Sequence, residues 1–398
     1  MDAATALWLT TPAGLDACRD AGLLLAGGTK PHGAIEKLRR TLDPVCAAAA
    51  WENALLRERA VGRFPQPDSM LFVREALEQA TSRPVAEYRA RRYSGFASVL
   101  DWGAGIGGDS LALAKQTKVV ALDRDGARAI LHRHNMAATG VAEKVLTIRG
   151  DGRLVHPLVA PAAFVDPDRR IMGRRTIEPA LGSPSLDEVL SRAPVHVGVK
   201  LAPAADASAW EKSGQSLEWI SCSGELKEQV LWRGDLSRPL RQAAVLPAGA
   251  VLAGDPLELA PEGYPEGYLL DPDPAVTCAG LAPVLAQITG SALLPEGGGF
   301  LVSRSPVSSP FACCLEIIAE FPLRPERLKT ELKALNAGPV EFRKRHSAID
   351  AEALRLRVKT RGDVPLIVAL TRHEGRDHGL ICRRIESMPT MAEAVDLP

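Results

Sequence analysis

The stretch VLDWGAGIGGD, residues 99–109, decides the fold class of this chain. An apolar run leads into a turn that is rich in glycine, and the helix-like pattern SLALAKQ follows at once. Two acids, Asp101 and Asp109, stand near its two ends. A strand, a glycine-rich turn and a helix N-terminus in this order let the backbone approach a nucleotide-like ligand closely. The stretch therefore predicts an α/β fold with a ligand at the turn.

Composition limits the classes of protein that remain. A length of 398 residues predicts two or three domains, and zero formal net charge excludes a chain-wide attraction for nucleic acid. The seven cysteines are scattered without a CxxC spacing, which indicates reduced thiols and neither a disulfide framework nor a metal site. We expect a cytoplasmic protein without a membrane segment, because the N-terminus lacks a basic leader and no apolar run reaches about 18 residues.

Sequence patterns divide the chain into three parts. Residues 1–95 read as an N-terminal helical domain, whereas residues 96–250 alternate between strand-like and helix-like runs, which predicts a parallel sheet covered on both faces. Near the end of the second part, LEWISCSGE and RQAAVL are expected to form a hairpin-like pair. Residues 251–398 read as a linker or docking loop, 251–275, followed by a small α+β domain of the ferredoxin-like kind with helices on one side of its sheet.

Local charge in the third part points to a polyanion. Residues 321–385 contain 15 Lys or Arg and 8 Asp or Glu, an excess of +7 in a neutral chain. Such an asymmetry is typical of a surface that contacts nucleic acid.

The acidic residues around the glycine turn limit the class of ligand that can bind there. Gly103, Gly105 and Gly108 also satisfy the dinucleotide pattern GxGxxG, but the carboxylate of Asp101 would repel a pyrophosphate and suit a cation. Asp123, 22 residues after Asp101, ends the next strand-like run and can accept hydrogen bonds from ribose hydroxyls. S-adenosylmethionine, a sulfonium without phosphate, therefore fits better than a nicotinamide dinucleotide, which stays a distant alternative.

Two of the acids have structural interpretations as well. Asp151, in RGDGR, can receive the amino group of adenine or simply form a turn. Asp109 can contact the cofactor or simply cap a helix.

Several segments together resemble class I S-adenosylmethionine-dependent methyltransferases, and in particular bacterial members with a C-terminal THUMP-like domain. These segments are QATSRPVAEYRARRYSGFASVLDWGAGIGGD, VVALDRD, the HN of ILHRHNMAATG, VDPDRR, VKLAP, CSGELKEQVLW and YLLDPDPAV. The core is also similar to trimethylguanosine synthases and tRNA guanine-N2 methyltransferases. The resemblance implies a Rossmann-like sheet and a cofactor site made of Thr81, Asp101, Gly103, Ala104, Gly105, Asp109, Asp123, Arg124, Asp151, Gly152 and Asp166.

The segment AAFVDPDRR, residues 162–170, is expected to hold the chemistry. Amino-methylating relatives have Asn, Asp or Ser here, then two prolines and an aromatic residue. Asp166 and Pro167 match, whereas Asp168 replaces the second proline and Arg169 the aromatic residue. An arginine can stack on a base or hold a phosphate, so the departure also permits a substrate with a carboxylate or phosphate. We assign catalysis to these four residues.

Other residues near this region allow competing interpretations. Arg169, Arg170, Arg174 and Arg175 could form a solvated loop, and a DPxR sequence also resembles uridine-5 methyltransferases, which would require Cys222 as nucleophile. The run GELKE, residues 224–228, could line the mouth of the crevice or form a hairpin turn. The basic run EYRARR, residues 87–92, is expected to be a solvated helix face.

Three residues follow the ribose acid on the next helix. His132 and His134 are spaced i, i+2 and point apart on a helix, so we expect packing or surface roles and no metal. Asn135 is expected near the adenine side.

These features predict a methyltransferase that modifies an exocyclic or ring nitrogen of an RNA base. RNA would bind the basic C-terminal domain and the Arg169–Arg170 region. The alternatives are a small-molecule or protein substrate, or a non-catalytic scaffold that binds the cofactor. Oligomeric state stays open.

Overall fold

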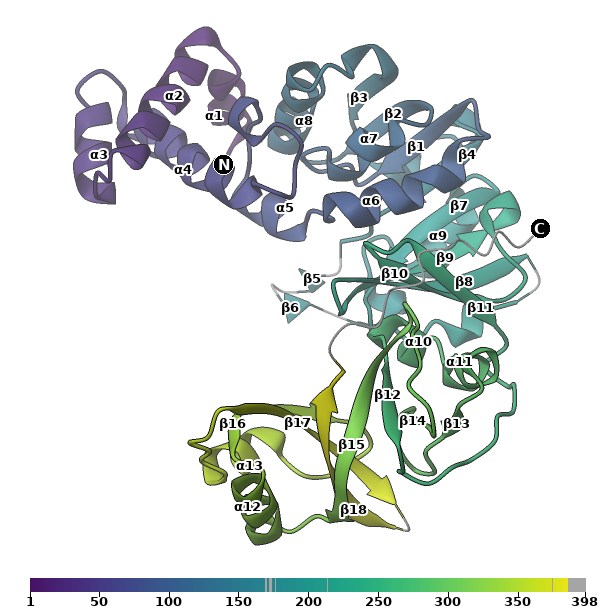
Figure 1. Ribbon diagram of the computed structural model, residues 1–398. Coiled ribbons are helices and arrows are strands. Elements are labelled where there is room, and N and C mark those ends of the chain that lie inside the picture. Colours follow the sequence, from purple (N-terminus) through teal and green to yellow (C-terminus); the bar gives the residue numbers. More distant parts are fainter. Residues whose placement is uncertain (169, 172–173, 176, 213, 374, 386–398) are drawn as a thin grey trace. The chain divides into compact units, whose positions relative to one another are not determined.

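The computed structural model describes residues 1–168, 170–171, 174–175, 177–212, 214–373 and 375–385 (Figure 1). The chain separates into two compact units. Unit 1 comprises Met1–Ser216 and Glu228–Pro239, and unit 2 comprises Leu217–Lys227 and Leu240–Pro398. In the described ranges, no helix has both the length and the apolar character to cross a membrane.

Unit 1 begins with helices, as the sequence predicts. They are α1 (Ala3–Leu9), α2 (Pro12–Ala26), α3 (Pro31–Leu38), α4 (Pro44–Ala60), α5 (Arg74–Gln79) and α6 (Arg83–Ala90). The Asp2, Thr11 and Asp43 side chains accept hydrogen bonds from the first backbone N–H groups of α1, α2 and α4. Pro31 and Pro44, which break the sequence pattern, are first residues of helices, where the missing N–H costs nothing.

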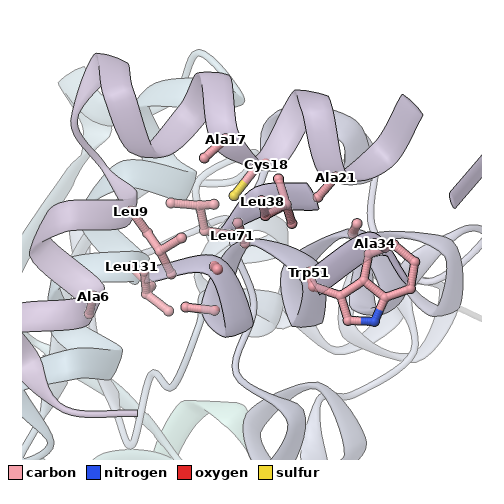
Figure 2. Packing of buried hydrophobic residues seen from close by; sticks show 14 of the residues in the cluster. Ala6, Leu9, Ala17, Cys18, Ala21, Ala34, Leu38, Trp51, Leu71 and Leu131 are labelled. Carbon is pink, nitrogen blue, oxygen red and sulfur yellow. The ribbon is translucent and has the colours of Figure 1, made fainter. Parts of the chain in front are cut away.

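A core rich in small residues holds these helices together (Figure 2). Alanines let helix backbones approach closely, and Cys18, Trp51 and Leu71 fill the space between them. Leu131, from α8 (Gly126–Ala138), packs in the same core. The helices before residue 95 therefore share buried surface with a helix that follows it, while the division of the chain into three domains stays a prediction.

The sheet of unit 1 is the predicted parallel sheet. Within unit 1 the strands of this sheet follow the order β9-β7-β4-β1-β2-β3 and are parallel except for β9, which runs antiparallel to β7. The strands are β1 (Ser98–Trp102), β2 (Lys118–Asp123), β3 (Val145–Arg149), β4 (Ala162–Val165), β7 (His196–Leu201) and β9 (Glu225–Arg233). Helices α7 (Gly108–Leu113), α8 and α9 (Leu186–Arg192) connect them. The short strands β5 (Arg170–Ile171) and β6 (Arg174–Arg175) pair antiparallel.

The predicted hairpin between LEWISCSGE and RQAAVL is wrong. These segments form β8 (Gln215–Cys222) and β10 (Arg241–Leu246), which are parallel neighbours. Ser223 and Gly224 both have positive φ, the requirement of a tight hairpin turn, so the strand that follows β8 in a hairpin is β9. β11 (Ala250–Gly254) pairs antiparallel with β10.

The predicted linker at 251–275 is also wrong in part. It contains most of β11 and all of β12 (Tyr268–Pro272), a strand between β14 (Leu301–Ser303) and β15 (Ala312–Pro322). Its prolines, glycines and acids concentrate in residues 255–267, between these strands. Helices α10 (Pro274–Cys278) and α11 (Ala282–Thr289) and strand β13 (Ala292–Leu293) follow.

The C-terminal sheet of unit 2 has the order β13-β14-β12-β15-β18-β17-β16. After β15 come α12 (Pro325–Ala334), β16 (Ala337–Lys344), α13 (Ala351–Arg357), β17 (Val364–His373) and β18 (Arg376–Arg384). Val368 of β17 packs with Leu328 of α12 and Leu354 of α13, whereas Ile367 packs in a second core with Phe300. The predicted open sheet with helices on one side is therefore present. Its element order, β-α-β-α-β-β, differs from the β-α-β-β-α-β order of ferredoxin-like domains.

Candidate active site

One pocket of unit 1 lies at the carboxyl ends of β1, β2, β4 and β7. It brings together twelve of the predicted site residues: Thr81, Gly103, Ala104, Gly105, Asp109, Asp123, Arg124, Asp151, Gly152, Asp166, Pro167 and Asp168. Asp101 lies behind its wall, and Arg169 is outside the described residues. In open α/β sheets ligands bind at this edge, because strand ends and loops converge there.

The glycine turn can follow its path only without side chains. Gly103 has φ +94°, and a Cβ there would lie 2.6 Å from the carbonyl oxygen of Asp166. Gly105 has φ +56°, but an added Cβ would meet nothing within 4 Å, so open space adjoins the backbone at this point. The N–H groups of Gly103 and Ala104 both donate to the Leu122 carbonyl, which fixes the turn against β2. The turn thus presents bare backbone to the pocket.

Asp123 is placed by backbone donors. Its Oδ2 accepts the N–H of Gly105 at 2.9 Å, and its Oδ1 accepts the N–H of Asp125 at 2.8 Å. Each carboxylate oxygen still has a lone pair that can accept a further hydrogen bond, as a ribose hydroxyl would require. The neighbouring Arg124 forms an ion pair with Asp168, 3.6 Å away, on the other side of the pocket.

Asp151 is both a turn former and a pocket residue. Its Oδ1 accepts the backbone N–H of Arg153 at 3.0 Å, and the Arg153 guanidinium also contacts both carboxylate oxygens. These hydrogen bonds lower the pKa of Asp151 to about 2. Gly152 faces the ring of Trp102 so closely that an added Cβ would lie 2.1 Å from ring atoms.

Asp101 is part of a buried hydrogen-bond chain. The Ser110 hydroxyl donates to its Oδ2, and His132 joins Ser110 (2.9 Å) to Thr147 (2.8 Å). Burial lowers the pKa of His132 to about 4, so the ring is neutral and passes one hydrogen bond on through each nitrogen. Burial, followed by the nearby Asp109 carboxylate, raises the pKa of Asp101 to about 8.

His132 and Asn135 are both buried. His132 packs in the interior, as expected. In the part of the chain that the structure describes, no group of three or more potential metal ligands occurs. Asn135 accepts the N–H of Leu71 (2.8 Å) and donates to the carbonyls of Leu71 and Ile106, each at 3.0 Å. It therefore ties the segment before α5 to the glycine turn.

The prediction of a solvated basic helix face fails at Arg89. This side chain is 2% exposed, and its guanidinium pairs with Asp109 and, at 2.9 Å, with Glu228. It also lies 4.2 Å from the centroid of the Phe164 ring. An arginine at a helix position that faces the core can be buried only where acids supplied by distant segments neutralise it. Glu228, from the run expected at the crevice mouth or in a hairpin turn, is buried inside β9.

Lys200 is a pocket residue that sequence reasoning missed. It belongs to β7, and its Nζ donates to Thr81 Oγ1 at 2.9 Å and to Asp166 Oδ2 at 2.8 Å. The signal was a lysine at the end of HVGVKL, a strand pattern with both faces apolar. Cys222, the alternative nucleophile, is not among the lining residues.

Charges behind and within the pocket do not balance. Asp101 keeps its proton near pH 7 because its pKa is raised, which leaves the carboxyl groups of Asp109, Asp166 and Glu228 facing two cations, Arg89 and Lys200, in the described part of this cluster. Burial also raises the pKa of Glu228 against the opposing effect of Arg89. A site with more acids than bases favours a ligand that carries positive charge.

Two segments of the chain match known domain families. Residues 312–384 match the THUMP domain-like family, and residues 2–60 match a domain of unknown function, DUF8688. An uncharacterized S-adenosylmethionine-dependent methyltransferase of Mycobacterium tuberculosis, found in two strains, is 34% identical over 359 residues, which cover 81% of this chain and 93% of the relative. The chain belongs to the S-adenosylmethionine-dependent methyltransferases.

A solved structure confirms the fold of this methyltransferase. A putative methyltransferase from Porphyromonas gingivalis W83 is similar with a TM-score of 0.73 at 21% identity, over 87% of this chain and 92% of that one. The expected methyltransferase fold, THUMP-like domain and S-adenosylmethionine dependence are thereby confirmed.

Proposed function

We propose that this methyltransferase transfers a methyl group to a nitrogen of an RNA base. The observation that carries the proposal is the position of Asp166 and Pro167, which directly follow β4 and lie in the wall of the pocket beside the glycine turn. A carboxylate and a backbone carbonyl at this point can hold the two hydrogens of an amino group and direct its lone pair. Positioning and exclusion of water then supply most of the rate.

The residues present fit S-adenosylmethionine. The open backbone at Gly105 gives room, Asp123 offers acceptors for ribose hydroxyls, and the excess of acids suits a cationic ligand. Asp151 would accept the adenine amino group. When bound, the cofactor supplies an electrophilic methyl group.

Exposed cations of the THUMP-like domain support RNA as the substrate. Arg324, Lys329 and Lys333 lie in or beside α12, and Arg357, Lys359 and Arg361 at the end of α13 or just after it. All six are exposed, and within the described residues none of them forms an ion pair. Cations without acidic partners can neutralise phosphates and release counterions, which gives affinity that depends on salt.

Methyl transfer from labelled cofactor to total RNA, DNA and protein extract tests the proposal. We expect label in RNA, and Asp166→Ala should abolish transfer with little loss of cofactor affinity. Asp187→Ala, which removes a carboxylate of α9 outside the pocket lining, is the matched control. Label only in protein or small molecules would refute RNA as substrate, and full cofactor binding without any transfer would favour the scaffold alternative.

A second measurement tests the basic surface. The triple variant Lys329→Ala, Lys333→Ala, Arg357→Ala should weaken RNA binding and reduce the slope of log affinity against log salt by about 3. Arg304→Ala, which removes a cation of unit 2 that is 90% exposed but paired with Glu266, is the control. An unchanged salt slope would remove this surface from the proposal.

A further inference from the structure

The buried position of Lys200 is unusual for an ammonium group and calls for an explanation. The residue is 6% exposed at the inner wall of the pocket, and lysine is almost never buried without a partner. Its two contacts are specific, to the Thr81 hydroxyl and to one oxygen of Asp166. Fold stability is a weak explanation, because desolvation of a buried ion pair offsets most of the attraction between the charges.

The contact with Asp166 leaves half of that carboxylate available. Nζ binds Oδ2 at 2.8 Å, and no donor from the described residues contacts Oδ1. The Asp166 side chain is 25% exposed and lines the pocket, so Oδ1 can meet a ligand. The backbone N–H of Asp166 donates to the Trp102 carbonyl at 3.0 Å, which fixes the residue at its other end.

We propose that Lys200 is the positioning residue that holds Asp166 by Oδ2 and turns Oδ1 toward the methyl acceptor. This inference rests on the proposed function, transfer to a base nitrogen. As the nitrogen lone pair forms the bond to the methyl carbon, the electrons of the carbon–sulfur bond stay with sulfur and the nitrogen becomes positively charged. An N–H proton then leaves, and Asp166 Oδ1 accepts it. Only an ionised Asp166 can do so.

The charges around Asp166 show why Lys200 is needed for this. The groups that face it are Lys200 from β7, Arg89 from α6, Asp101 from β1 and Glu228 from β9. Arg89 is already paired with Asp109 and Glu228. Without Lys200, Asp166 would face two other acids with no cation of its own among the described residues. A carboxylate that loses an adjacent cation takes up its proton at higher pH.

Steady-state kinetics of Lys200→Met with labelled cofactor and RNA test the inference. We expect kcat to fall about 100-fold, the acid limb of the pH profile to move up by about one pH unit, and cofactor affinity and the KM for RNA to change less than about threefold. Lys200→Arg, which keeps the charge, should recover part of kcat and restore the acid limb. Lys115→Met, which removes a surface lysine paired with Glu87, is the matched control.

The outcomes separate this inference from the proposed function. If wild-type protein labels no RNA, the proposed function fails and the role of Lys200 fails with it. If it labels RNA and Lys200→Met keeps its kcat and acid limb, only the role of Lys200 is refuted, as it is if kcat falls without movement of the limb. Should Lys200→Met not fold, Lys200→Gln, which removes the charge but keeps a hydrogen-bond donor, decides: a lowered kcat with a raised acid limb supports the inference, and an unmoved acid limb refutes it.

Discussion

At the glycine end of the pocket the polar groups are backbone atoms and carboxylates of adjoining turns, whereas at the Asp166 end they are side chains gathered from distant elements. Asp123 meets Gly105 across 18 residues, but Lys200 meets Asp166 across 34 and Thr81 across 119. The first arrangement follows from the path of the chain. The second exists only after β7, α6 and β9 have packed, so its stability and its chemistry depend on the whole of unit 1.

The largest effect on stability is expected from a substitution at the Asp166 end of the pocket, where side chains from distant elements meet. Arg89→Met leaves Asp109 and Glu228 without their shared cation in the interior, which should lower the free energy of unfolding by about 3–5 kcal/mol. Urea denaturation measures it. Adding Glu228→Met should recover part of the loss, since an apolar pair can replace a buried ion pair. A loss below 1 kcal/mol would mean that the network is solvated.

At the glycine end of the pocket, an added Cβ atom should destabilise the fold by steric overlap. Gly103→Ala places a Cβ 2.6 Å from the Asp166 carbonyl oxygen at a positive φ, and we expect a loss of about 3 kcal/mol in unfolding free energy. Gly105→Ala is the control for backbone strain alone, because its Cβ meets open space, and should lose about 1–2 kcal/mol. Equal losses for both variants would show that the contact with Asp166 is unimportant.

Asp101, which lies behind the pocket wall, should make the free energy of unfolding depend on pH. Burial raises its pKa to about 8, so between about pH 4 and pH 8 the folded state holds a proton that the unfolded chain has released. Its contribution to stability therefore falls as pH rises through this window, by at most about 1.4 kcal/mol per unit. Urea denaturation of Asp101→Asn from pH 5 to pH 8 should show a flatter profile than wild type. Asp20→Asn, an exposed control, should keep the wild-type slope.

The smallest effect is expected at the exposed pair of the glycine end. Arg153→Gln removes the partner of Asp151, but both side chains are partly solvated, at 42% and 29% exposure. The midpoint of urea denaturation should not change, since exposed ion pairs contribute little. Cofactor affinity should be unchanged or higher, because Asp151 Oδ2 becomes a free acceptor while Oδ1 keeps the backbone N–H of residue 153. A weaker affinity, measured by calorimetry, would assign Arg153 itself to the ligand.

Features that depend on neighbouring residues could be predicted from the sequence. The glycine turn, the parallel strands and the acids that end them follow from periodicity and from the conformations open to glycine. Arg89 and Lys200 could not be assigned, because their burial depends on Glu228, Asp109 and Asp166, which tertiary structure brings close. The run EYRARR resembles a solvated helix face because the local sequence does not show that those acids lie beside it in the fold.

Errors in strand order have a similar cause. RQAAVL was expected to pair with LEWISCSGE as a hairpin, but Ser223 and Gly224 turn the chain into β9 first. β12 was hidden in a segment rich in proline and glycine, where composition describes residues 255–267 correctly and obscures the five-residue strand after them.

Asn135 connects the glycine turn with the segment before α5 through hydrogen bonds. Its side chain bonds the backbone N–H and carbonyl of Leu71 and the Ile106 carbonyl of the glycine turn, 64 and 29 residues away. Leu71 also belongs to the core of the N-terminal helices. A ligand that rigidifies the turn should therefore also restrain Leu71, and slower amide hydrogen exchange at Leu71 would report that the pocket is filled.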